Sequence, residues 1–343
     1  MVSKSSISRV QSPQKTGRLL RPALLILLCF SLAMAAIAVW TFIEADRLMR
    51  DEPEPLPVFN SNVMPGFTPV SFRSLDEQTT LHGWFMQADQ PISTIILIHD
   101  VDRNRLQFGL ETPLLYRHLV SLGYNVLSFD LRNTGQSGGH LSAYGYAEWA
   151  DVIAAIRYVR LYATTQDVLL YGFGTGASAA LIAWDQLPVS DEDRENKSKP
   201  IKELTFDRSY VKGILLDSPA SSPDDPIGAR YRDRHPLAQR ILSTTVPYAV
   251  RLSSGSIRHL SHITVLGSCH IPVFIAAHTE DTVIGQASAE TVLRERELSH
   301  PDLTTVFTSE TAGYIDGFDL DQEKYLDAVT RFLTRFFQAS TPG

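Results

Sequence analysis

The chain has little cysteine and no overall excess of basic residues, and both absences exclude classes of protein. Two cysteines in 343 residues, Cys29 and Cys269, cannot form the disulfide framework of a small secreted domain. Residues 1–43 carry five basic residues and no acidic one, so the net charge of −7 leaves −12 on the remainder. This acidic body repels phosphates, which argues against nucleic acid as a partner.

The sequence also lacks the patterns that bind metals and nucleotides. No cluster of histidine, cysteine and carboxylate residues has the spacing of metal ligands, and no phosphate-binding loop occurs. The glycine-rich run at Gly172, Gly174 and Gly176 lacks the spacing and the downstream acid of a dinucleotide fingerprint. We therefore expect no metal and no cofactor.

A long apolar run stands near the start of the chain. Residues 23–43 are 21 residues without a charge, and as a helix they would span about 31 Å, the thickness of a bilayer core. Basic residues precede the run and acidic residues follow it. This asymmetry predicts a single-pass anchor in the cell membrane, with residues 1–22 as a cytoplasmic tail and the body outside.

Two alternatives to the anchor remain open. The stretch Ala33-Met34-Ala35 resembles a cleavage site, so the run could be a signal peptide whose removal releases a secreted protein. A buried core helix is the other alternative.

Beyond the apolar run, short apolar segments alternate with helical patterns. Residues 44–66 hold four prolines among acidic residues, which predicts a stiff linker. Eight segments predict strands: Thr68–Arg73, Thr80–Met86, Ser93–His99, Asn125–Asp130, Val168–Phe173, Val211–Asp217, Pro272–His278 and Leu303–Thr308. The alternation after the first pair indicates an α/β domain around a buried, mostly parallel sheet.

Two insertions interrupt this alternation. Residues 190–207 are rich in charge, which favours a mobile surface loop. Residues 219–270 contain helical patches and several prolines, and they stand where this architecture often carries a cap over its cleft. A plain connecting segment is the alternative for the second insertion.

Six motifs follow one another along residues 67–338. They are Ile95–Asp100 with the following Arg103–Arg105, LGYNVLSFDLRNTGQSGG at Leu122–Gly139, the helix at Tyr146–Tyr158, LLDSP at Leu215–Pro219, AHTEDTVI at Ala277–Ile284 and AGYIDGF at Ala312–Phe318. In this order they resemble the α/β-hydrolase family, in a membrane-anchored branch similar to serine aminopeptidases and monoacylglycerol lipases. The resemblance implies the α/β-hydrolase fold, with an eight-stranded, mostly parallel sheet flanked by helices and an inserted cap.

The resemblance also implies a serine–histidine–acid triad, but two of its three positions carry other residues. The family's nucleophile sits on a strained turn from a strand to a helix, and the matching stretch LLYGFGTGAS places Gly174 there. The acid position is Asp281 and the base position is Tyr314. A tyrosine hydroxyl, with an ordinary pKa near 10, is a poor proton acceptor at neutral pH. We expect it to hydrogen-bond to Asp281 instead, because a buried hydroxyl needs a partner.

The oxyanion hole implied by the resemblance is altered as well. Its donors would be the backbone N–H groups of Val101 and Thr175. His99 lies near the same cleft, at the end of its strand, where a structural role is expected. The family's glycine after that histidine is Asp100 here. Unless it points to solvent, its carboxylate would oppose the negative charge that the hole stabilises.

Residues at other positions are poor candidates for the nucleophile or the base. Ser137 stands in a literal Gly-x-Ser-x-Gly pattern but lies in the loop after a strand, not on a strand-to-helix turn. Ser178 lies one helical turn beyond the elbow, and Thr175 should direct its backbone at the oxyanion hole. His300 is the only histidine after the acid position, and it precedes its strand, about 20 Å from the active edge.

These replacements favour a pseudohydrolase that binds a ligand or partner without serine-type turnover. An active esterase, lipase or peptidase that uses residues outside the motif positions is the alternative, as is another chemistry on the same fold.

Overall fold

A computed structural model describes most of the chain. The described residues are 17–51, 54–58, 63–256, 258–278, 280–309 and 313–338. Residues 1–16 of the expected tail and residues 52–53 and 59–62 of the expected linker lie outside them.

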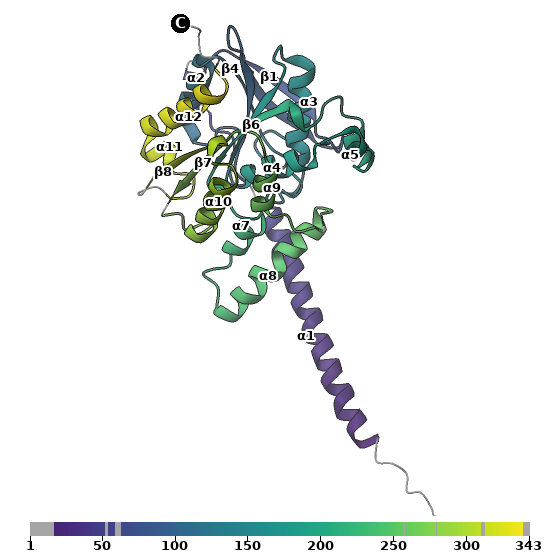
Figure 1. The fold of residues 1–343 in the computed structure, drawn as a ribbon. Helices are drawn as coiled ribbons and strands as arrows, with labels where there is room; N and C mark the ends of the chain where they lie inside the picture. The colour runs from purple at the N-terminus through teal and green to yellow at the C-terminus, as the bar shows by residue number, and fades with distance from the viewer. Residues whose placement is uncertain are drawn as a thin grey trace, which may run out of the picture.

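An eight-stranded sheet forms the centre of the domain (Figure 1). Its strands are β1 (Phe67–Arg73), β2 (Thr80–Met86), β3 (Ser93–Ile98), β4 (Tyr124–Phe129), β5 (Val168–Phe173), β6 (Val211–Asp217), β7 (Val273–His278) and β8 (Thr304–Ser309). Their order is β1-β2-β4-β3-β5-β6-β7-β8, with β2 antiparallel to both of its neighbours and the other pairs parallel. The eight predicted strands agree with these bounds to within one residue, because strands buried on both faces appear as continuous apolar runs.

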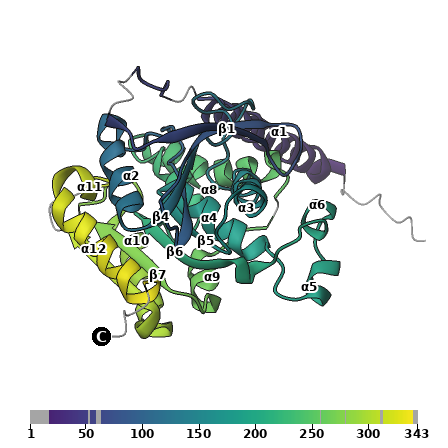
Figure 2. The same ribbon diagram turned by 90° about the horizontal axis from the view of Figure 1, so that it is seen from above.

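Helices cover both faces of the sheet (Figure 2). One face packs against α2 (Thr112–Ser121) and α12 (Gln322–Phe336), and the other against α3 (Trp149–Tyr162), α4 (Thr175–Gln186) and α10 (Gln286–Ser299). Within β3, the side chains of Ile95 and Leu97 lie on the face covered by α2 and α12. The side chains of Ile96 and Ile98 lie on the opposite face. This alternation follows from the two-residue period of a strand.

The helix α1 (Gly17–Met49) extends away from the domain (Figure 1). It is long and apolar enough to cross a membrane by length and composition. The prediction that a linker begins at residue 44 was wrong, because the helix continues through Met49. Ala45 and Met49 are buried in a cluster with residues 143–147 and with the helices that follow β6, and this packing extends the helix beyond its apolar run.

The segment at residues 190–207 was predicted to be a loop, and that prediction also needs correction. It contains two short helices, α5 (Asp191–Glu195) and α6 (Lys199–Lys202). Ile201, Leu204 and Phe206 are buried in the main core. These three apolar side chains pack an otherwise highly charged segment onto the domain.

Residues between β6 and β7 leave the sheet and form three helices. These are α7 (Asp224–Ala229), α8 (Pro236–Ser253) and α9 (His262–Ser268). The helix α9 packs against α4 and α10, whereas α7 packs against α8, and α8 contacts α1. A last short helix, α11 (Gly317–Leu320), precedes α12.

Candidate functional site

The site is centred on the sharp turn between β5 and α4. Gly174 at this turn has φ 52° and ψ −113°, a conformation that a residue with a Cβ adopts only under strain. Its N–H donates to the carbonyl of Asp217 at 2.9 Å. A Cβ on Gly176 would lie 2.2 Å from the carbonyl oxygen of Ile98, so the helix packs directly on the neighbouring strand. The turn at the predicted nucleophile position is therefore tight and closely packed, and it carries no side chain.

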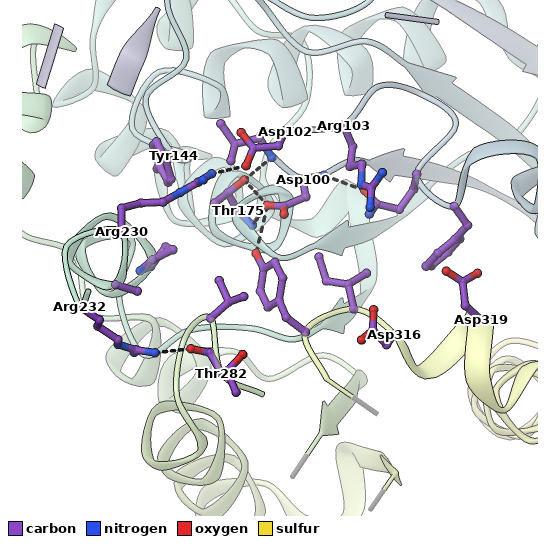
Figure 3. A pocket seen from close by; sticks show the side chains of 18 of the residues that line it. Asp100, Asp102, Arg103, Tyr144, Thr175, Arg230, Arg232, Thr282, Asp316 and Asp319 are labelled. Atoms are coloured by element: carbon purple, nitrogen blue, oxygen red, sulfur yellow. Dashed lines mark hydrogen bonds and ion pairs between the residues drawn. The ribbon is translucent and has the colours of Figure 1, made fainter. Parts of the chain in front are cut away.

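The carboxylate of Asp100 lies above this turn (Figure 3). Its Oδ1 accepts the backbone N–H of Thr175 at 2.9 Å and the Thr175 hydroxyl at 2.7 Å. The backbone N–H of Val101 donates in turn to Thr175 Oγ1 at 2.8 Å. Both N–H groups expected to form an oxyanion hole thus have acceptors within the protein. Asp100 is only 7% exposed, so its side chain does not point to solvent, and it stands where the hole would receive negative charge.

Tyr314 completes the closure of the space above the turn. Its hydroxyl donates to Asp100 Oδ1 at 3.1 Å, and a Cβ on Gly174 would lie 2.0 Å from that hydroxyl. The expected bond from Tyr314 to Asp281 was wrong, because the Tyr314 hydroxyl lies over the turn and donates to Asp100 instead. Burial, followed by the charge of Asp100, raises the pKa of Tyr314, which keeps the hydroxyl protonated as a donor.

Asp281, the predicted acid position, is held in place by backbone donors. Its Oδ1 accepts the N–H groups of Val283 and Ile284 at 2.9 and 3.0 Å. Its Oδ2 is buried and has no hydrogen-bond partner among the described residues. Burial raises the pKa of this carboxyl, an effect that the two N–H donors oppose.

We predicted that His99 lies in the cleft, and this was wrong, because His99 lies beneath the site and does not line the cleft. It is 3% exposed. Its Nδ1 lies 2.7 Å from the carbonyl oxygen of Asp100, and its Nε2 accepts the N–H of Leu131 at 2.9 Å. Burial lowers its pKa. Because both ring nitrogens hold the loops after β3 and β4 together, His99 has the structural role that the sequence suggested.

The other residues weighed as replacements have structural partners or lie elsewhere. Ser137 Oγ donates to the carbonyl of Asp130 at 2.6 Å and accepts the N–H of His82 at 2.9 Å. Ser178 is 1% exposed and lies within α4. His300 Nε2 lies 2.8 Å from the carbonyl oxygen of Gly267, and the residue precedes β8 at the far end of that strand. None of these side chains reaches the elbow.

A buried polar network next to the elbow was missed by the sequence analysis. Asp217 at the end of β6 accepts the hydroxyl of Tyr325 at 2.6 Å and contacts His278 Nε2 at 3.1 Å. The Tyr325 hydroxyl also lies 2.6 Å from that of Tyr171. The signal was present, since Asp217 and His278 end adjacent parallel strands, whose carboxyl ends meet at one edge. Burial lowers the pKa of His278, but Asp217 outweighs it and the pKa is raised.

A cleft of about 1010 Å³ opens over this edge of the sheet. Its walls come from residues 100–109, 226–233, 282–283 and 314–319, with Tyr144 and Thr175. Figure 3 shows Arg230 paired with Asp102 across it. The described residues that line it include no serine, cysteine or histidine. Over the described part of the chain, no three histidine, cysteine or carboxylate residues are placed to hold a metal.

A family model described as the alpha/beta hydrolase family matches residues 80–335. The chain belongs to the α/β-hydrolase family. The protein YqkD of Bacillus subtilis (strain 168) is 23% identical over 256 residues, which are 74% of this chain and 75% of YqkD.

Solved structures of α/β-hydrolases share the fold. The esterase Pf2001 of Pyrococcus furiosus superposes with a TM-score of 0.63 at 18% identity, covering 84% of this chain and all 100% of that one. The esterase EaEST of Exiguobacterium antarcticum gives a TM-score of 0.51 at 16% identity, covering 79% and 100%. At these identities the likeness concerns the fold of the α/β-hydrolase domain and not its chemistry.

Proposed function

We propose that this α/β-hydrolase is a membrane-anchored pseudohydrolase whose cleft binds a ligand or partner without hydrolysing it. The observation that supports this most strongly is the position of Asp100. Its Oδ1 accepts the Thr175 N–H at 2.9 Å, so an acceptor of the protein itself already stands where a reaction intermediate would place its oxyanion. A substrate carbonyl could use this donor only after Asp100 moved away.

Three losses act together at the site. Gly174 supplies no attacking atom, Tyr314 replaces the base, and the expected oxyanion donors have internal acceptors. In serine hydrolases the loss of the nucleophile or the base alone costs about 10⁶-fold in turnover, nearly as much as the loss of all three triad residues. Retaining Asp281 therefore does not restore hydrolysis. The cleft remains open, with charges of both signs on its walls, and suits a polar ligand.

A fluorophosphonate probe, which reacts covalently with activated serines wherever they lie, tests this proposal. We expect no labelling of the purified full-length chain in detergent, because the elbow has no hydroxyl and the cleft lining has no serine among the described residues. The readout is the mass of the intact protein, with an active serine esterase in the same sample as the positive control. Labelling of any serine would instead support an active hydrolase with unrecognised residues.

The placement of the chain in a membrane is part of the same proposal. Residues 1–22 are basic and the acids begin at Glu44, so we place the tail in the cytoplasm and the domain outside. Protease added outside intact cells should therefore digest the domain and leave a short fragment, containing the N-terminus, protected. A protected domain would reverse the orientation, and a domain recovered free of membrane would indicate cleavage of a signal peptide.

A further inference from the structure

The helix α8 exposes a continuous apolar stripe. Leu237, Tyr248 and Leu252 are 66%, 51% and 43% exposed, and the half-buried Ile241 lies between them. At about 100° per residue, these four positions fall within about 60° of one another on the helix. The buried face of α8 points elsewhere and consists of Leu242, Val246, Ala249 and Val250. The stripe is thus additional to the apolar face that packs into the domain.

The contact between α8 and α1 determines how deep this stripe would lie relative to a membrane spanned by α1. The hydroxyls of Thr41 and Thr245 lie 2.8 Å apart, and Thr245 is at the middle of α8. Thr41 comes 18 residues after Ala23, where the apolar run begins. This distance is about 27 Å along a helix, against a bilayer core of about 30 Å. If α1 spans a membrane, the middle of α8 therefore lies at the outer boundary of the hydrocarbon.

The orientation of the stripe relative to α1 also suits contact with lipid. On the helical projection Thr245 stands about 80° from Leu237, at the edge of the stripe, so the stripe lies next to the face that meets α1. Arg240 is exposed on the opposite edge, where its long side chain can reach the head groups. Figure 1 shows α8 crossing α1 and running away from it. This combination of an apolar stripe and a flanking basic residue is typical of helices that lie in a membrane interface.

We infer that α8 lies in the outer membrane interface, with Leu237, Ile241, Tyr248 and Leu252 against the lipid. The inference rests on the proposed anchoring by α1. Since the cap residues Arg230 and Arg232 line the cleft just before α8, this arrangement holds the cleft wall at the level of the head groups.

Site-directed fluorescence in the full-length chain, reconstituted into bilayers, tests the inference. Leu252→Cys is made in a Cys29→Ala background and labelled with an environment-sensitive dye, since Cys269 is 0% exposed and stays unlabelled. Lipids carrying a nitroxide near the head of the acyl chain should remove about half of the emission of a dye at this depth. Iodide in the water should remove little. The matched control is Leu161→Cys on α3, which is 64% exposed and should respond to iodide alone.

The native Cys29 separates failure of the inference from failure of the anchor. In the otherwise unchanged chain, a dye on Cys29 within α1 should be quenched by lipid nitroxides if the anchor spans the bilayer. Quenching at Cys29 with iodide quenching at position 252 would overturn the interfacial placement and leave the anchor standing. Protection of position 252 from both quenchers would mean that a protein covers the stripe, which also overturns the inference. Absence of lipid quenching at Cys29 would remove the anchor itself.

Discussion

Combining Gly174→Ser with Tyr314→His is expected to give weak hydrolysis of a small activated ester, and adding Asp100→Gly is expected to increase it. The first change adds the nucleophile and the second adds a base beside the free Oδ2 of Asp281. The third removes the carboxylate that accepts the N–H of Thr175. Loss of one oxyanion donor costs about 10²- to 10³-fold in turnover. We therefore expect the triple variant to exceed the double variant Gly174→Ser with Tyr314→His by about 10²-fold.

The single change Gly174→Ser is expected to destabilise the protein without creating activity. A Cβ at this position would lie 2.0 Å from the Tyr314 hydroxyl, and φ of 52° is unfavourable for serine. Strain of this kind costs about 1–3 kcal/mol. Adding Tyr314→His should recover part of the lost stability, because the shorter imidazole leaves the space above the turn.

The measurements are ester turnover and melting temperature across the series. The matched control is Asp281→Asn in the triple variant, which should reduce turnover by about 10⁴-fold because the new imidazole would lose the acid that orients it. Fluorophosphonate labelling should localise to position 174 alone. Turnover by the unmodified protein that survives Gly174→Ala would show that the reactive residues lie elsewhere, and the pseudohydrolase proposal would fail.

The sheet could be predicted from the sequence because its strands are buried on both faces. Val168–Phe173 and Val211–Asp217 have the same bounds in the sequence prediction and in the structure. The end of α1 could not be predicted in this way. Ala45 and Met49 are ordinary helix residues followed by prolines, and only their packing in the same cluster as Val246 explains why the helix continues.

The sequence predicted which positions form the candidate site, but not how their side chains are arranged in space. The sequence identifies Gly174 as a missing nucleophile and Asp100 as an unusual residue beside the hole. It does not reveal where the Asp100 side chain points, since that depends on the N–H and hydroxyl of Thr175, which are brought close by the pairing of β3 with β5. The choice of Asp100 and not Asp281 as the acceptor of the Tyr314 hydroxyl likewise depends on the three-dimensional arrangement.

The pseudohydrolase proposal requires a fold that is stable without the catalytic residues, and the retained turn accounts for that stability. Gly174 adopts a positive φ without the strain that a serine would impose. The space that a serine would occupy is filled by the hydroxyl of Tyr314 and the carboxylate of Asp100, which hydrogen-bond to each other. A catalytic site must leave this space open to substrate, whereas here it is part of the folded structure.

The loop that carries Asp100 depends on a buried ion pair, and Arg105→Met should destabilise the protein by about 3–5 kcal/mol. The guanidinium of Arg105 donates to both oxygens of Asp130, at 3.1 and 2.6 Å, and the two side chains are 1% and 0% exposed. Removing one partner leaves the other charge buried and uncompensated. The measurement is the free energy of unfolding of the full-length chain in detergent.

A neighbouring arginine provides the matched control. Arg103 pairs with Glu54 at 2.8 Å, but both side chains are 50% exposed, so Arg103→Met should cost no more than about 1 kcal/mol. Adding Asp130→Asn to Arg105→Met should recover stability, because no charge then remains buried. If it recovers none, the cost comes from lost packing of Arg105 over Trp84 and not from the unpaired carboxylate. Hydrogen exchange of residues 100–108 should rise in Arg105→Met and stay unchanged in Arg103→Met, since only the first change releases the loop that holds Asp100 against Thr175.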